Sequence, residues 1–368
     1  MKLVCTQENL AKGLQTVSRV ATTRSSLPIL ANILVATDGG RLKLAATDLE
    51  VGVTTWIGAK VSGEGSVTLP ARLFVDFVTS NTDETLELSV SGYEATVKSP
   101  HYNATLNGMD ANDFPLIPPP GKDEVAVVPA ATLRRALQGT LYAAAVDDTR
   151  PVLNGVFLKV EGTTLTLAAT DSYRLAERRI ELTKGPKELV TLILPARAAA
   201  ELVRILPETE DEVALTLSAN QLSLAVQDTQ VVSRLIEGVY PDYTQIIPKE
   251  IGTSVTLARA ELAAAVKMSS LFARDSAGHI RLKFLPDKGL DIEAVSPSAG
   301  KNTATIQAEV TGEALEVAFN AKYVLDALNA LTAPQVVLSS TGVDRPGILR
   351  PVGDDTSLAL VMPLRLDA

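Results

Sequence analysis

The sequence has few of the side chains that enzymes use for catalysis. Of its 368 residues, one is cysteine (Cys5), two are histidine (His101 and His279), and 4% are aromatic. Neither histidine lies in an HxxE or HExxH pattern, and a single cysteine excludes an intramolecular disulfide. A lone cysteine also fits a reducing compartment. We therefore expect no catalytic site, no cofactor and no metal centre.

Three further absences limit the class of protein. No apolar run approaches the roughly 18–20 residues that a membrane-spanning helix needs. The stretch from Met1 to Glu8 lacks the apolar core of a signal peptide, so we expect a soluble, cytoplasmic protein. The net charge is −9, so any attraction to nucleic acid must come from a local basic surface.

Two short motifs suggest chemistry but do not support it. Gly300-Lys301 is followed by asparagine, and Val295 stands where a P-loop has its first glycine. The pair Asp147-Asp148 could be read as metal ligands, but a solvated, capped loop is the stronger interpretation. Asp48 and Asp171 lie at the ends of a repeated motif, so we assign them turn-forming or capping roles.

The chain is built from an internal repeat. Leu-Ala-Ala-Thr-Asp occurs at 44–48 and again at 167–171, 123 residues later. Downstream, Leu-Pro-Ala-Arg occurs at 69–72 and at 194–197, and a fainter third copy covers 279–322. Proline-rich stretches close the first two copies. The repeat predicts three similar domains, at residues 1–121, 122–248 and 249–368.

Each repeat alternates helical and strand patterns. Apolar residues three and four apart predict a helix at the start of each unit and a second helix near its middle, and alternating apolar residues predict strands after each helix. The fold class is therefore α+β, with two helices and antiparallel sheets in each domain. The expected helical segments are 6–20, 71–79, 131–145, 196–206, 258–274 and 321–331.

Charge is divided unevenly between these segments and the rest. The six helices hold eleven Lys and Arg residues and five Asp and Glu residues, a net charge of +6. Since the whole chain carries −9, the remainder carries −15. A basic helix layer suits a protein that presents one face to a polyanion, although helix surfaces also collect Lys and Arg without such a role. Few aromatics accompany these cations, so contact with phosphates is favoured over base stacking.

These features resemble the beta subunits of bacterial DNA polymerase III, the DNA sliding clamps. The resemblance covers the whole chain and depends on several blocks in the same order: 23–30 (TRSSLPIL), 150–155 (RPVLNG), 169–175 (ATDSYRL), 240–243 (YPDY) and 361–366 (VMPLRL). It implies a DNA-clamp fold in which two chains close head to tail into a ring, with helices lining the hole and sheets forming the rim.

The resemblance also implies functional sites. DNA contacts would be made by Arg24, Arg72, Arg150 and Arg197. The joint of the homodimer would involve Leu106, Leu271 and Phe272. A pocket for partner peptides with Leu and Phe anchors would be formed by Thr170, Ser172, Tyr173, Arg174, Leu175, Pro241, Ile246, Leu360, Val361, Met362, Pro363 and Leu364. Pro151, Val152 and Gln245 depart from residues found in some relatives.

The implied function is a processivity factor that encircles duplex DNA independently of sequence and tethers the replicative polymerase, the clamp loader and other replication and repair proteins. One alternative is a repeat-built scaffold that binds proteins but not DNA, which the helix charge of +6 disfavours. Another is an enzyme with an unrecognised site, which the scarcity of histidine and of ligand clusters disfavours.

Overall fold

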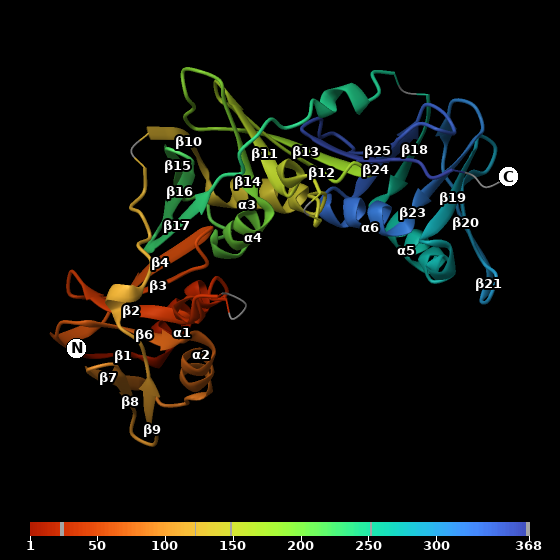
Figure 1. Ribbon diagram of the computed structural model, residues 1–368. Coiled ribbons are helices and arrows are strands. Elements are labelled where there is room, and N and C mark those ends of the chain that lie inside the picture. Colours follow the sequence, from red (N-terminus) through yellow and green to blue (C-terminus); the bar gives the residue numbers. More distant parts are fainter. Residues whose placement is uncertain (23–25, 122, 148, 251, 366–368) are drawn as a thin grey trace. The chain divides into compact units, whose positions relative to one another are not determined.

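The computed structural model describes residues 1–22, 26–121, 123–147, 149–250 and 252–365 (Figure 1). The chain divides into two compact units. Unit 1 comprises Met1–Ala130 and Arg204–Leu235, and unit 2 comprises Ala131–Val203 and Ile236–Ala368. Strands within the described residues pair antiparallel throughout, which confirms the predicted α+β class.

Each of the six predicted helices is present among the described residues, and its ends lie within four residues of the predicted ones. The α-helices are α1 (Gln7–Ser18), α2 (Ala71–Ser80), α3 (Ala130–Leu141), α4 (Ala196–Ile205), α5 (Arg259–Ser270) and α6 (Ala321–Ala330). Short 3-10 helices are η1 (Pro28–Ala31), η2 (Ala111–Asp113), η3 (Pro151–Leu153), η4 (Tyr243–Ile246) and η5 (Arg274–Ser276).

Unit 1 contains a five-stranded sheet of order β5-β1-β7-β8-β9 and an eight-stranded sheet of order β10-β15-β16-β17-β4-β3-β2-β6. The strands are β1 (Lys2–Thr6), β2 (Asn32–Asp38), β3 (Arg41–Thr47), β4 (Val51–Ile57), β5 (Lys60–Gly63), β6 (Ser66–Pro70), β7 (Thr85–Ser91), β8 (Glu94–Lys98), β9 (Asn103–Asn107), β10 (Asp123–Pro129), β15 (Glu212–Ser218), β16 (Gln221–Val226) and β17 (Thr229–Arg234).

Unit 2 contains a nine-stranded sheet of order β14-β11-β12-β13-β26-β25-β24-β18-β22 and a four-stranded sheet of order β21-β20-β19-β23. The strands are β11 (Gly155–Glu161), β12 (Thr164–Thr170), β13 (Arg174–Glu181), β14 (Val190–Pro195), β18 (Thr253–Ala258), β19 (His279–Leu285), β20 (Gly289–Ser296), β21 (Gly300–Ile306), β22 (Val310–Thr311), β23 (Leu315–Asn320), β24 (Gln335–Ser340), β25 (Gly347–Pro351) and β26 (Ser357–Val361).

The sequence pattern missed the strand that opens each repeat. Strands β1, β10 and β18 come before the first helix of their repeats and pair with β7, β15 and β24, which follow the second helix. In each repeat, the first strand is thus paired with the strand that follows the second helix. This pairing is long-range, so periodicity within a short window does not reveal it.

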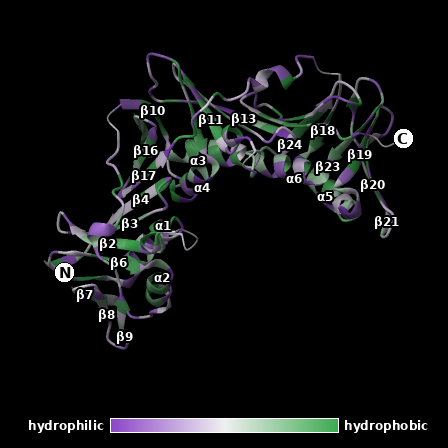
Figure 2. Cartoon of the chain, viewed as in Figure 1, coloured by the Kyte–Doolittle hydropathy of each residue, from purple (hydrophilic) through white to green (hydrophobic). Residues whose placement is uncertain are grey.

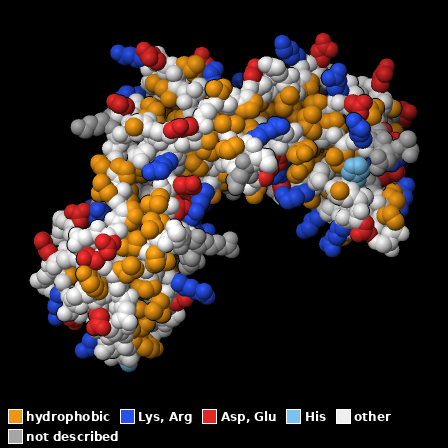
Figure 3. Space-filling model, viewed as in Figure 1, with side chains coloured by type: hydrophobic (Ala, Val, Ile, Leu, Met, Phe, Trp, Pro, Cys, Tyr) orange, Lys and Arg blue, Asp and Glu red, His pale blue; other side chains and the backbone are white. Residues whose placement is uncertain are grey.

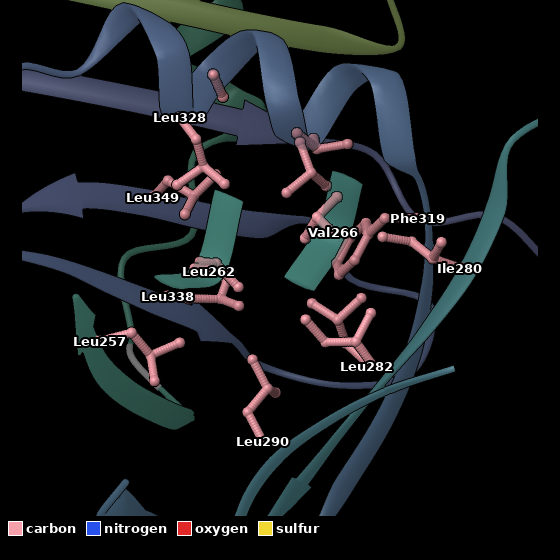
Figure 4. Close-up of a cluster of buried hydrophobic side chains, with 14 of the residues drawn as sticks. Leu257, Leu262, Val266, Ile280, Leu282, Leu290, Phe319, Leu328, Leu338 and Leu349 are labelled. Atoms are coloured by element: carbon pink, nitrogen blue, oxygen red, sulfur yellow. The ribbon is translucent and has the colours of Figure 1, made fainter. Parts of the chain in front are cut away.

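Apolar helix faces pack onto the sheets, as the hydropathy colouring of Figure 2 shows. In α1, Leu10, Leu14 and Val17 have the four- and three-residue spacing that predicts a helix, and all three are fully buried. Figure 4 shows the corresponding core of the third repeat, where Leu262 and Val266 of α5 meet Leu328 of α6 and strand residues such as Leu282 and Leu338. Leucine, isoleucine and valine build most of this interior, as the low aromatic content predicts.

Two sheets continue from one repeat into the next. In unit 1, β4 of the first repeat pairs with β17 of the second. In unit 2, β13 of the second repeat pairs with β26 of the third. We call these pairings the first and second junctions. In both, the third strand after the opening helix meets the last strand of the following repeat.

Candidate functional site

The second copy of the repeated motif forms a tight turn between β12 and β13. The Thr170 hydroxyl donates to the carbonyl of Arg174 at 2.7 Å and accepts from the amide of Ser172 at 3.1 Å. Asp171 Oδ1 accepts from the amides of Tyr173 at 2.9 Å and Arg174 at 3.0 Å. Ser172 has a positive φ of 75°, which this turn requires.

The first copy forms the same turn between β3 and β4. The Thr47 hydroxyl donates to the carbonyl of Val51 at 2.9 Å and accepts from the amide of Leu49, whose φ is 78°. Asp48 Oδ1 accepts from the amides of Glu50 and Val51. The predicted turn-forming role of both aspartates is therefore confirmed, because each satisfies two backbone donors.

The two turns differ at their last position, where Val51 is matched by Arg174. Arg174 is 8% exposed and its Nε contacts Asp171 Oδ2 at 3.0 Å, while Nη1 contacts Asp326 Oδ2 at 2.5 Å. Its guanidinium also lies 4.7 Å from the ring centroid of Tyr323 and 5.5 Å from that of Tyr142. Two carboxylates and two aromatic faces thus offset the cost of burying this charge.

The linker after the second repeat packs beneath this turn. The Thr170 amide donates to the Tyr240 hydroxyl at 3.1 Å, and the Tyr243 hydroxyl donates to Glu177 at 2.7 Å. Tyr240 stacks on Phe157 with ring centroids 4.9 Å apart. Burial raises the pKa of both tyrosines above the ordinary value, so both hydroxyls stay protonated. Aromatic side chains of the linker and of β11 thus support the turn.

The residues predicted for the peptide pocket separate into a floor and a surface. Buried residues, which support the site rather than face solvent, are Thr170, Arg174, Leu175, Leu360 and Val361. Exposed or half-buried residues, which a ligand can touch, are Ser172, Tyr173, Pro241, Ile246, Met362, Pro363 and Leu364. The amide of Met362 donates to the carbonyl of Tyr173 at 2.8 Å, which joins the turn to the end of β26.

An open cavity of about 590 Å³ adjoins this surface. Its lining includes Ile246 and Met362 from the predicted set and Gln245, which the sequence singled out as a departure from some relatives. The remaining lining residues were not singled out from the sequence: Pro248, Lys249, Glu250, Thr341, Asp344, Arg345 and Pro346. These residues come from the linker before β18 and the loop between β24 and β25. We call the cavity and the exposed pocket residues the groove. An apolar anchor position with charges at its edge suits a short peptide.

The four predicted phosphate contacts have different surroundings. Arg24 lies outside the described residues. Arg72 of α2 has a 92% exposed side chain, with Nε 3.9 Å from Asp76 Oδ2. Arg197 is exposed on α4. Arg150, in contrast, donates to the Ser172 hydroxyl at 3.2 Å and therefore borders the groove.

Two helix cations are engaged in the fold itself. In unit 1, Arg204 donates to the carbonyls of Gln15 and Thr16 in α1. In unit 2, Arg259 donates to the carbonyls of Leu328 and Ala333, at and beyond the end of α6. Cations at helix C-termini satisfy orphan carbonyls and the helix dipole. The helix charge of +6 therefore overstates the charge available to a polyanion. On the face drawn in Figure 3, Lys and Arg side chains gather along α5 and α6.

The predicted joint residues also differ in exposure. Leu106 in edge strand β9 is 2% exposed, so its side chain already belongs to the core of unit 1. Leu271, directly after α5, is 46% exposed, and Phe272 is half-buried against the core of the third repeat.

Two kinds of structural feature are absent from the described part of the chain. Among the residues that the structure describes, no group of three or more His, Cys, Asp and Glu side chains is placed to hold a metal ion. No described helix is long and apolar enough to cross a membrane.

Comparison with known proteins assigns the whole chain. Residues 1–118, 127–242 and 244–365 match the N-terminal, central and C-terminal domains of the DNA polymerase III beta subunit. The chain belongs to the DNA polymerase III beta subunit family. Among its relatives, the beta sliding clamp of Synechococcus elongatus is 35% identical over 100% of both chains.

Solved structures of the family have the same fold. The DNA polymerase sliding clamp of Bacillus subtilis superposes with a TM-score of 0.95 at 28% identity, covering 100% of both chains. The sliding clamp of Pseudomonas aeruginosa, solved bound to griselimycin, gives a TM-score of 0.93 at 30% identity, again over 100% of both chains. The expected family and fold are therefore confirmed.

Proposed function

We propose that this chain is a non-catalytic sliding clamp. Two copies join head to tail into a ring that encircles duplex DNA and tethers the replicative polymerase and other replication and repair proteins, in the cytoplasm and without a cofactor. The three repeats act as domains 1–121, 122–248 and 249–368. The observation that carries this proposal is that, among the described strands, the three repeats form only two junctions within one chain.

The missing third junction leaves complementary strand edges. By position in the repeat, β21 matches β4 and β13, and β9 matches β17 and β26. Both β21 and β9 lie at sheet edges, and unpaired edges invite pairing with another chain. An edge of the third repeat that meets the matching edge of a second copy's first repeat makes a heterologous contact, which generates a ring when it closes.

The register of this third junction follows from the other two. One alanine occupies the same position in each repeat, on the strand before β4, β13 or β21. It pairs with a residue of that next strand: Ala46 with Val53, Ala169 with Ala176 and Ala294 with Asn302. In the last hairpins, the matching pairs are Val97 with Ala104, Leu224 with Val231 and Leu349 with Ala359. The junction pairs are Val53 with Val231 and Ala176 with Ala359. The third pair is therefore Asn302 with Ala104 of the partner subunit.

The same comparison supports Leu271 as a joint residue. Helices α3 and α5 are each 12 residues long and are followed by Tyr142 and Leu271. Tyr142 of the second repeat packs against the core of the third repeat. Leu271 therefore stands where a contact with the next repeat, in the partner subunit, is expected.

For the DNA face, we propose Arg72 and Arg197, with Arg24, as phosphate contacts. Arg72 and Arg197 are the second residues of α2 and α4, at matching positions 125 residues apart. Exposed cations in a first helical turn bind phosphates without reading sequence. Arg150 is better suited to the rim of the groove, because it contacts Ser172.

For partner proteins, we propose the groove as the docking site of short peptides with Leu and Phe anchors. Met362 supplies a flexible apolar wall, and Tyr173, 61% exposed, supplies an aromatic one. Griselimycin, which the Pseudomonas aeruginosa clamp binds, is a suitable competitor in a binding assay.

The decisive test of encirclement measures retention on DNA. The clamp is loaded with its matching loader and ATP onto nicked circular DNA, and retention is compared before and after the DNA is linearised. Loss on linearisation supports a ring that slides off the ends. Equal retention on circular and linear DNA would mean direct adhesion and would overturn the proposal.

A cysteine pair tests the predicted joint. Paired antiparallel residues have Cα atoms roughly 4.5–5.5 Å apart, within the range of a disulfide. Ala104→Cys with Asn302→Cys should give one covalent dimer on a non-reducing gel after mild oxidation. In the control, Ala104→Cys with Thr303→Cys, the second thiol points to the opposite face of β21 and should not cross-link. Equal cross-linking of both pairs would refute the register.

A further inference from the structure

One carboxylate of α6 is shared by two cations with different surroundings. Lys322 Nζ and Arg174 Nη1 both contact Asp326 Oδ2, each at 2.5 Å. The Lys322 side chain is 71% exposed, whereas that of Arg174 is 8% exposed. The same oxygen atom therefore joins a solvent-facing ammonium to a buried guanidinium.

The buried guanidinium leads directly to the groove. Arg174 Nε contacts Asp171 Oδ2 at 3.0 Å, and Asp171 Oδ1 accepts the amides that define the turn. The carbonyl of that turn at Tyr173 accepts from the amide of Met362, which lines the cavity. A continuous series of hydrogen bonds and ion pairs thus connects Lys322 with the surface that a peptide would touch.

Lys322 occupies the same position in its repeat as two of the proposed phosphate contacts. It is the second residue of α6 and matches Arg72 of α2 and Arg197 of α4 at intervals of 125 residues. Each of these basic residues has an acidic residue four positions later, at Asp76, Glu201 or Asp326. Lys322 is thus the third member of the set that contains two proposed phosphate contacts.

The second junction differs from the first junction and the proposed third junction in the residue at the position of Arg174, which faces Asp326. The residue that meets Asp326 from the preceding repeat is Arg174. Its counterparts in the first and third repeats are Val51 and Gly300, which are uncharged. Only the junction that borders the groove therefore has a cation at this position.

We propose that Asp326 is a positioning residue of the groove and that Lys322 couples the groove to DNA phosphates. The inference rests on the proposed function and deepens it. When a phosphate binds the Lys322 ammonium, Asp326 pairs with Arg174 alone and holds the 170–174 turn more firmly. Peptide affinity then rises, and by linkage a bound peptide raises DNA affinity by the same factor. Because an exposed ion pair contributes little, the expected coupling is about two- to fivefold.

The test uses the full-length protein and a fluorescently labelled peptide with Leu and Phe anchors. Peptide affinity is measured by anisotropy at low salt, with and without a short linear duplex, and DNA affinity is measured separately. Asp326→Asn should weaken peptide binding about tenfold or more, because Arg174 loses a charged partner. Lys322→Met should raise peptide affinity without DNA about two- to fivefold, because Asp326 then pairs with Arg174 alone. The same variant should weaken DNA binding and abolish the coupling.

Matched controls come from the first repeat. Asp76→Asn should leave peptide affinity unchanged, and Arg72→Met should weaken DNA binding but keep the coupling. Thermal unfolding checks each variant, and if Asp326→Asn does not fold, Lys322→Met carries the test, since its side chain is mostly exposed. Wild-type behaviour of both α6 variants, in a protein that binds peptide and DNA, would overturn this inference alone. A wild-type chain that binds neither peptide nor DNA would overturn the proposed function as well.

Discussion

Replacing Leu271 with alanine should open the ring at its joint. In the isolated chain this side chain is 46% exposed, so about half of its surface remains to be buried by a partner. Complete burial of a leucine side chain stabilises by about 1.5–3 kcal/mol, so the remaining half contributes about 1 kcal/mol. A two-membered ring contains this contact twice. Leu271→Ala should therefore cost about 2 kcal/mol and raise the dimer Kd about 30-fold.

Sedimentation velocity over a concentration series measures this Kd directly. The matched control is Leu189→Ala, whose leucine is 57% exposed in the loop before β14 and outside the proposed joint. Both variants should lose a similar, small amount of stability within the isolated chain, because each leucine is about half buried there. Equal dimer Kd values for wild type and Leu271→Ala, or an equal loss in the Leu189→Ala control, would refute the assignment of Leu271 to the joint.

Three further changes test other parts of the structure. Burial raises the pKa of the Cys5 thiol to about 11, so at pH 8 only about one thiol in a thousand is ionised. A disulfide reagent should therefore modify Cys5 slowly in the folded protein and rapidly in urea, and the rate in the folded protein should rise as the pH approaches the pKa of the thiol. Gly347→Ala would place Cβ 2.5 Å from Phe319 Cζ, so urea denaturation should show a loss of about 1–3 kcal/mol, whereas Gly58→Ala, with open space around it, should show little change. Arg72→Met should lower the slope of log K for DNA against log salt by about 1, while Arg259→Met, which removes a helix cap, should lower stability.

Local patterns were sufficient to predict the six helices of this fold. The stripe of Leu10, Leu14 and Val17 is spaced for one helix face, and all three are buried. Asparagine is a favoured N-cap, and the Asn320 side chain before α6 accepts from the amides of Lys322 and Tyr323. These features depend on residues a few positions apart, which periodicity captures.

The surroundings of Arg174 could not be predicted in the same way. A charged residue at the start of a strand is expected at the surface. Its burial depends on Tyr142 at the end of α3, Tyr323 and Asp326 in α6, and Asp171 in its own turn. No spacing rule links these elements, because only the pairing of β13 with β26 brings them together.

The same limit applies to charge. Counting Lys and Arg by helix treats every cation as available at the surface. Arg204 and Arg259 instead donate to main-chain carbonyls at the end of another helix, so they stabilise the fold. A sequence gives the number of charges, but their hydrogen-bond partners decide which of them a polyanion can reach.

The junctions explain why a chain of three repeats should assemble further. A repeat that joins the next through matching strands always leaves one strand unused at each end of the chain, here β9 in unit 1 and β21 in unit 2. Because the two unused edges correspond to the two sides of an existing junction, they are complementary to each other and not to themselves. A symmetric, face-to-face dimer would pair β9 with β9 and leave both β21 edges open. Head-to-tail closure pairs both β9 and β21, and it therefore removes two exposed strand edges that would otherwise promote aggregation.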